Sequence, residues 1–178
     1  MQQKRVWRLI GGRNPNHLVK TGPMWISAAL LLSLCMTAYA QTLEISPVTV
    51  DRGSANIFRI TLNPRAEKPI AALQWELVYR DRVRIAPSGV VPGTASEMAG
   101  KAVTCVRKAA DISHYRLACI LAGGAEALSA GVIAIVRVEA AQNAPKGEWL
   151  VDLENVIGVS PALETIPLKG TRTSITLR

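Results

Sequence analysis

Few residues of this sequence could carry out covalent or redox chemistry. Beyond residue 40 it contains two cysteines, Cys105 and Cys119, and one histidine, His114. The cysteines lie too far apart for a Cys-x-x-Cys redox motif, and no His/Cys group with metal-ligand spacing surrounds them. An even pair in an exported chain is typical of a disulfide, so we expect Cys105 and Cys119 to be bonded. The alternative is two buried free thiols.

His114 follows Ser113 and lies near Asp111 in a predicted hairpin loop. Adjacent side chains point apart along a chain, so Ser113 and His114 cannot form a catalytic relay through proximity in sequence. No HExxH motif, paired carboxylates or Gly-rich phosphate loop is present, and "LAGG" at 121–124 is typical of a turn. We therefore expect no catalytic residue, no metal site and no cofactor.

The first 40 residues have the pattern of an export signal. Residues 1–24 carry five basic residues and no acidic one, and the apolar run "WISAALLLSLCMTAYA" then ends in Ala38-Tyr39-Ala40. A basic lead, a short apolar centre and small residues before the cut are typical of a cleaved leader. The run is shorter than the roughly 20 apolar residues of a membrane span. We expect a leader over residues 1–40, starting at Met1 or Met24, and no stable membrane span afterwards.

Removing this leader changes the charge of the protein. The whole chain has a net charge of +8, but five of its 21 basic residues and none of its 13 acidic residues lie in residues 1–40. Residues 41–178 therefore carry 16 bases against 13 acids, a net charge of +3. Nucleic-acid binding requires basic residues clustered on one face. The sequence favours a secreted, periplasmic or cell-surface protein that binds no nucleic acid.

Residues 41–178 have the length of a single domain and contain no Gly/Ser-rich or Pro-rich linker. Short apolar-alternating runs recur between turn residues, and no segment has a sustained helical period. Nine strands are expected, at 42–50, 56–62, 70–79, 82–86, 101–106, 115–121, 131–140, 148–159 and 171–177. "PSGVVPGTASEMAG" is expected to be a long loop. Many short strands with Gly and Pro between them predict an all-β sandwich of two packed sheets.

Alternation predicts which side of each strand faces the core. If Cys105 lies opposite Cys119 in a hairpin, Val103 lies opposite Leu121 and Arg107 opposite Leu117. The cysteine side is the drier one, so the disulfide is expected to point inward. In "IAALQWELVYRDRVRI", residues 70–85, Trp75 falls on the same side as Leu73 and Leu77. A large aromatic residue in an alternating strand usually packs in the core, so Gln74 and Glu76 are expected to point outward.

Three stretches resemble the cohesin domain family. They are "IAALQWELVYRDRVRI", "LSAGVIAIVRVEA" and "VDLENVIGVSPALETIPLKGTRTSITL", and the match spans residues 42–177. The sequence departs from the family pattern at "YRDR", where Asp-Pro usually follows the Tyr, and the cysteine hairpin suggests a divergent, non-cellulosomal type. The resemblance implies a nine-stranded jelly-roll β-sandwich. It also implies that the third, fifth, sixth and eighth strands share a sheet whose outer side docks a dockerin, a small calcium-binding module.

Resemblance and alternation together predict a binding surface for another protein, a dockerin-like module or an envelope component. Its expected residues are Gln74, Glu76, Thr104, Val106, Arg116, Ala118, Ile120 and Asp152. The expected role is non-catalytic docking in extracellular polysaccharide breakdown or envelope assembly. The alternative is a carbohydrate-binding module that holds polysaccharide directly. That function needs exposed, coplanar aromatic rings, and beyond residue 40 there are only Phe58, Trp75, Tyr79, Tyr115 and Trp149.

Overall fold

The computed structural model describes residues 41–65, 67–108 and 114–178. The predicted leader, residues 1–40, lies outside the described residues, as do Asp111 and Ser113. Across the described ranges, no helix has the length and apolar character needed to cross a bilayer.

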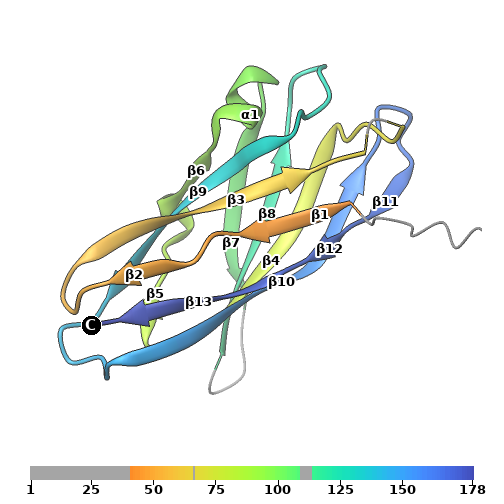
Figure 1. The fold of residues 1–178 in the computed structure, drawn as a ribbon. Helices are drawn as coiled ribbons and strands as arrows, with labels where there is room; N and C mark the ends of the chain where they lie inside the picture. Colours follow the sequence, from red (N-terminus) through yellow and green to blue (C-terminus); the bar gives the residue numbers. More distant parts are fainter. Residues whose placement is uncertain (1–40, 66, 109–113) are drawn as a thin grey trace, which may run out of the picture. The chain divides into compact units, whose positions relative to one another are not determined.

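Two β-sheets make up the domain, and they form the two layers of a sandwich (Figure 1). The six-stranded sheet has the order β12-β1-β3-β9-β5, and β6 also pairs with β9. The bounds of its strands are β1 Thr42–Ile45, β3 Ala55–Asn63, β5 Val83–Arg84, β6 Val90–Pro92, β9 Gly131–Ala140 and β12 Lys169–Gly170. The seven-stranded sheet has the order β2-β13-β10-β4-β8-β7, and β11 also pairs with β10. The bounds of its strands are β2 Val48–Val50, β4 Ala72–Arg80, β7 Ala102–Lys108, β8 His114–Ala122, β10 Gly147–Val159, β11 Thr165–Pro167 and β13 Arg172–Leu177.

The core lies between the two sheets and is built by alternation. On β4, Leu73, Trp75 and Leu77 are at most 1% exposed, and they pack with Phe58 and Ile60 of β3. The prediction that Trp75 faces inward is confirmed. Burying such side chains stabilises the fold by about 1.5–3 kcal/mol each, and a slip of one residue would turn this set of side chains toward water.

The disulfide joins Cys105 of β7 to Cys119 of β8, as predicted. The ladder pairs Val103 with Leu121, Cys105 with Cys119 and Arg107 with Leu117, so the predicted register is also confirmed. Cys119 is buried and Cys105 packs against the core. Among the described residues β7 is the last strand of its sheet, so the bond fastens an edge strand to its neighbour β8. In the chain-entropy account a loop of this length contributes about 3 kcal/mol of stability.

The number of strands was predicted wrongly: the described residues contain thirteen, not nine. The run 42–50 is two strands, because Pro47 has no N–H for a ladder and the chain there crosses from β1 in one sheet to β2 in the other. The stretch between residues 160 and 171, read as a connection, contains β11 and β12.

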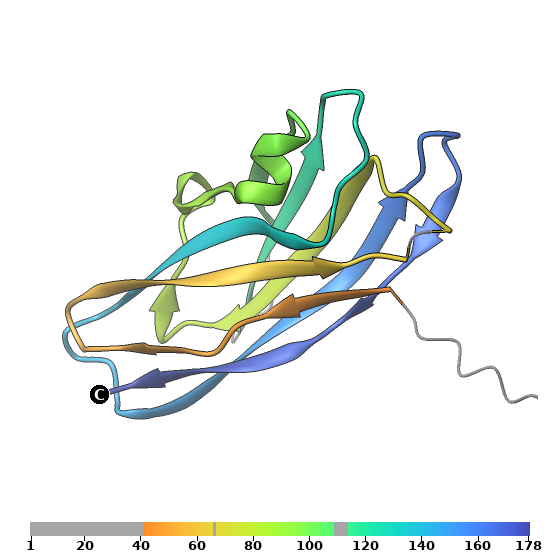
Figure 2. The same ribbon diagram turned by 45° about the horizontal axis from the view of Figure 1, so that its top comes forward.

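The expected long loop after β5 also contains regular structure. It holds a 3-10 turn, η1 (Pro87–Gly89), then β6, then a single helical turn, α1 (Thr94–Met98). Figure 2 shows α1 beside β9 at one border of the sandwich. Ser96 of α1 is fully buried, and its hydroxyl donates to the carbonyl of Ile133 at 2.7 Å. The helix is five residues long, too short to show a period of 3.6 in the sequence.

Candidate functional site

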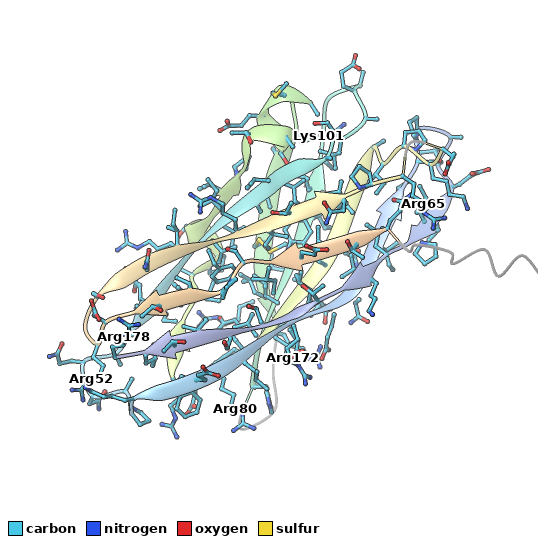
Figure 3. All side chains as sticks on the ribbon, in the orientation of Figure 1. Arg52, Arg65, Arg80, Lys101, Arg172 and Arg178 are labelled. Atoms are coloured by element: carbon cyan, nitrogen blue, oxygen red, sulfur yellow. A yellow bond between two sulfur atoms is a disulfide. The ribbon has the colours of Figure 1, made fainter. Side chains whose placement is uncertain are left out.

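The outer face of the seven-stranded sheet, hereafter the outer face, carries the outward side chains of β7, β8, β4 and β10. The ladders place these side chains in transverse rows, because each strand is paired with its neighbour in a defined register. The strand order β10-β4-β8-β7 corresponds to the arrangement that the cohesin resemblance implied. Arg80 and Arg172, labelled in Figure 3, point away from the six-stranded sheet.

The first row contains no charged residue. It runs from Thr104 through Ile120 and Gln74 to Ile157. Ile120 is 52% exposed and Ile157 38% exposed, and Val106 in the next row is 57% exposed. These three side chains, with Thr104, Gln74 and Ala118, form a continuous group that we call the apolar row. Exposed apolar groups of this kind, bordered by polar residues, commonly mark contact surfaces.

A charged group borders the apolar row, and Glu76 is its centre. Glu76 points outward from β4, yet its side chain is only 5% exposed. One carboxylate oxygen accepts from the Lys108 ammonium group, and the other accepts from Arg116 Nη1 at 3.0 Å and from Asn155 Nδ2 at 3.0 Å. A carboxylate so far out of water is tolerated because donors on β7, β8 and β10 satisfy both oxygens.

The donors also set the protonation state of this carboxyl group. The hydrogen bond from Lys108 is the largest influence and lowers the pKa of Glu76 below its usual value of 4.5, with Asn155 and Arg116 acting in the same direction. Burial acts in the opposite direction and is outweighed. Glu76 is therefore ionised at neutral pH.

Arg116 extends the group to β10. Its Nη1 also donates to Glu154 Oε2 at 2.7 Å. The hydrogen bond to Glu154 is the largest influence on the pKa of Arg116 and raises it, and the hydrogen bond to Glu76 acts in the same direction. Next to it, Arg172 of β13 pairs with Asp152 of β10. The group thus holds three acids and three bases that neutralise one another, which leaves the apolar row as the part of the outer face that water solvates least well.

A β-bulge in β10 brings Ile157 to the outer face. The ladder with β4 pairs Glu154 with Glu76 and then Ile157 with Gln74, with a register shift between them. Asn155 lies in the bulge with a φ of 50°, a conformation that asparagine tolerates better than most residues. The extra residue reverses the alternation, so Asp152 and Glu154 point outward before the bulge and Ile157 after it.

All eight residues predicted for a binding surface lie on the outer face. Their exposure differs: Gln74, Thr104, Val106 and Ile120 are exposed, Arg116, Ala118 and Asp152 are half-buried, and Glu76 is buried beneath its partners.

Sequence reasoning missed Lys108, Glu154, Asn155 and Ile157 on this face. Lys108 lies beyond the predicted end of its strand, and the other three lie at or beside the bulge. The "NV-G-SP" stretch of the sequence was the only sign that β10 departs from regular alternation.

The other residues considered in the sequence, namely His114, possible metal ligands and the aromatic rings, do not belong to the predicted binding surface. His114 begins β8 and is half-buried, and the Ser and Asp near it in sequence lie outside the described residues. Within residues 41–65, 67–108 and 114–178, no three His, Cys, Asp or Glu side chains are grouped so that they could hold a metal ion. Phe58, Trp75 and Tyr79 are buried, so these three rings cannot stack on a sugar.

This chain matches solved structures in its fold, but it matches no known protein family or curated protein in its sequence. No protein-family model matches the chain, and no curated protein matches it in sequence. Among solved structures, the chain is similar to the sixth cohesin of scaffoldin B from Acetivibrio cellulolyticus, solved with a mutant Cel5 dockerin. That match has a TM-score of 0.62 and 15% identity, and it covers 78% of this chain and 99% of the cohesin.

Two further cohesins give similar values. The OlpA cohesin of Clostridium thermocellum, in a type I cohesin–dockerin complex, has a TM-score of 0.63 at 12% identity, covering 78% of this chain and 99% of that one. A non-cellulosomal cohesin from the archaeon Archaeoglobus fulgidus has a TM-score of 0.59 at 8% identity, covering 78% and 91%. The chain therefore has the β-sandwich fold of cohesin modules, and the predicted resemblance is confirmed as a likeness of fold.

Proposed function

We propose that this protein is an exported, non-catalytic module that docks another protein on its outer face. The observation that carries the proposal is the apolar row. Ile120, Val106 and Ile157 are exposed together on three strands, and the charged group beside them is internally neutralised. A partner that covers this surface removes apolar area from water without having to desolvate unpaired charges.

The structural neighbours support a protein as the partner. Two of them were solved in complexes with dockerins, which are themselves protein modules. The partner we propose is therefore a dockerin-like module or a component of the cell envelope, and the setting is extracellular polysaccharide breakdown or surface assembly. An apolar surface with a polar border has the anatomy of a protein interface.

Affinity capture with two matched variants tests the docking face. Ile120→Asp places a charge in the apolar row, and Ile57→Asp places the same charge on β3, where Ile57 is 42% exposed on the other sheet. We expect proteins captured by the wild type from secreted and envelope fractions to be lost with Ile120→Asp and retained with Ile57→Asp. Quantitative mass spectrometry of the captured fractions gives the measurement.

The thermal midpoint of each variant serves as the control. Both isoleucines are exposed, so we expect neither substitution to change the midpoint by more than a few degrees. Loss of the same proteins with Ile57→Asp, or their retention with Ile120→Asp, would show that the outer face is not the docking surface. Retention on cellulose or chitin without any protein partner would instead favour carbohydrate binding.

Export is a separate part of the proposal and has its own test. We propose cleavage after Ala40, where the small residues at 38 and 40 fit a leader peptidase. The first strand begins at Thr42, so cleavage there would leave every strand of the sandwich intact. Mass spectrometry of the protein expressed from its full-length gene should find Gln41 at the N-terminus. A chain that keeps residues 1–40 would contradict export by this route.

A further inference from the structure

The disulfide joins the two strands that carry most of the apolar row. Cys119 of β8 is buried, and Cys105 of β7 packs against the core from the edge of the sheet. The residues on either side of each cysteine in the sequence point outward and belong to the apolar row, namely Thr104, Val106, Ala118 and Ile120. The two halves of this part of the row are therefore held together by the bond beneath them.

β7 has few other links to the domain. Among the described residues its backbone pairs only with β8, and none of its residues is buried. β8 in contrast pairs with both β4 and β7, and its Leu117 and Leu121 are fully buried. A segment with little buried apolar surface belongs to the part of a fold that opens at low cost.

Two side-chain contacts also hold β7, and both lie at its C-terminal end. The ammonium group of Lys108 donates to Glu76, and Arg107 Nη2 donates to the carbonyl of Ile85 at 3.3 Å. The disulfide is placed differently, because Cys105 is the middle residue of β7. It therefore fastens the part of the strand that carries Thr104 and Val106.

The backbone around the cysteines shows which amides would report on an opening of β7. The Cα atoms of Cys105 and Cys119 are 4.1 Å apart, a short spacing that is typical of a non-hydrogen-bonded pair in an antiparallel ladder. The pairs on either side, Thr104 with Ile120 and Val106 with Ala118, are then the hydrogen-bonded ones. Separation of β7 from β8 would free the amide hydrogens of Thr104 and Val106.

The two cysteines differ in their access to solvent. Cys119 is fully buried, whereas Cys105 is partly exposed on its edge strand. Thiol–disulfide exchange requires that an attacking thiolate reach one of the two sulfur atoms. Cys105 is therefore the position at which a reducing thiolate reaches this bond.

We propose that the Cys105–Cys119 disulfide is a redox switch for the docking surface, with a dithiol as the reductant. A thiolate of the dithiol attacks Cys105 Sγ and forms a mixed disulfide, while Cys119 Sγ leaves with the electron pair of the S–S bond and takes up a proton. The second thiol of the reagent then displaces Cys105, which leaves as a thiol, and the dithiol becomes a disulfide. Reduction lets β7 separate from β8, which takes Thr104 and Val106 out of the apolar row. The proposal rests on docking at the outer face.

Amide hydrogen exchange of the ¹⁵N-labelled protein tests whether the disulfide controls β7. The oxidised protein is compared with the protein reduced by dithiothreitol, and a mass gain of two hydrogen atoms verifies the reduction. We expect the amides of Thr104 and Val106 to exchange about tenfold faster or more after reduction, and those of β9 in the other sheet to keep their rates. Unchanged rates at Thr104 and Val106 would overturn the proposal. Equal acceleration in β9 would overturn it too, because the whole domain would then unfold.

Affinity capture tests whether the switch acts on docking. The double variant Cys105→Ala/Cys119→Ala lacks the bond without any reductant, so a loss of captured proteins cannot come from reduction of the partner. We expect it to capture no more than reduced wild type does, with a thermal midpoint that remains above the assay temperature. Capture at the level of the oxidised wild type would overturn the proposal. If the oxidised wild type itself captures no protein, docking at the outer face fails, and the exchange rates alone decide whether the disulfide controls β7.

Discussion

Glu76 is the residue whose environment most shapes the outer face. Its carboxylate is almost removed from water, and its donors come from three different strands. Ion pairs of this kind contribute little when both partners are exposed, but removing one partner of a buried pair is costly because the other charges lose their compensation. Glu76 therefore acts as a structural centre that orients Lys108, Arg116 and Asn155 beside the apolar row.

Replacing Glu76 by Gln should lower the free energy of unfolding by about 2 kcal/mol at pH 7. The pH dependence follows from the lowered pKa of Glu76 in the folded protein. A lowered pKa stabilises the fold fully above the usual value of 4.5, and this contribution is lost as the pH falls through the folded value. Urea unfolding from pH 7 to pH 3 should show the difference between wild type and Glu76→Gln shrinking below pH 4.5.

Glu154→Gln provides the matched control for this experiment. Glu154 also pairs with Arg116, but its side chain is 42% exposed, so its loss should change the free energy of unfolding by well under 1 kcal/mol. Equal effects of the two substitutions, or a Glu76→Gln difference that is constant with pH, would show that Glu76 is not the centre of the charged group.

For single residues, the sequence predicts which side of the sheet a side chain faces better than it predicts how deeply that side chain is buried. Alternation correctly placed Trp75 inside and Glu76 outside, because both follow from one strand alone. The burial of Glu76 could not be predicted in this way. It depends on Lys108, Arg116 and Asn155, which reach it from β7, β8 and β10 and lie far from it in sequence.

Among the elements, the bulge in β10 matters most for the outer face. Asn155 combines a φ of 50° with a hydrogen bond to Glu76. Glycine adopts this φ without strain but cannot donate from a side chain, whereas alanine can do neither. We expect Asn155→Ala to lower the free energy of unfolding by about 1 kcal/mol more than Asn155→Gly, measured by urea unfolding at pH 7.

Asn155→Asp separates the hydrogen bond from the backbone conformation. Aspartate also tolerates positive φ, but it would place a second carboxylate against Glu76. We expect it to be more destabilising than Asn155→Gly at pH 7 and to recover as the pH is lowered. If all three variants are as stable as the wild type, neither the backbone conformation of Asn155 nor its hydrogen bond supports β10.

Element length explains which strands the sequence could predict. Long strands such as β3, β4, β8, β9 and β10 contain enough alternating positions to be recognised. β6, β11 and β12 have only two or three residues each, too few to show a period. In β10 the alternation of the sequence placed Asp152 outward, and it assigned no side to the residues after Glu154, where the bulge shifts the register.

In the molecule as a whole, the two sides of the seven-stranded sheet have different roles. The inner side builds the core with Trp75 and the disulfide. The outer side presents the apolar row, and it is where we propose that a protein partner docks. The sandwich has the fold of cohesin modules, and the registers of its strands place the apolar row on one side of the seven-stranded sheet and the core on the other.

Methyl NMR of the protein with a captured partner tests the docking surface most directly. Isoleucine methyl groups report on both sheets at once: Ile120 and Ile157 lie on the outer face, and Ile57 lies on the six-stranded sheet. The account predicts that the partner shifts or broadens the methyl signals of Ile120 and Ile157 and leaves that of Ile57 in place. A shifted Ile57 signal with unchanged signals from Ile120 and Ile157 would contradict it.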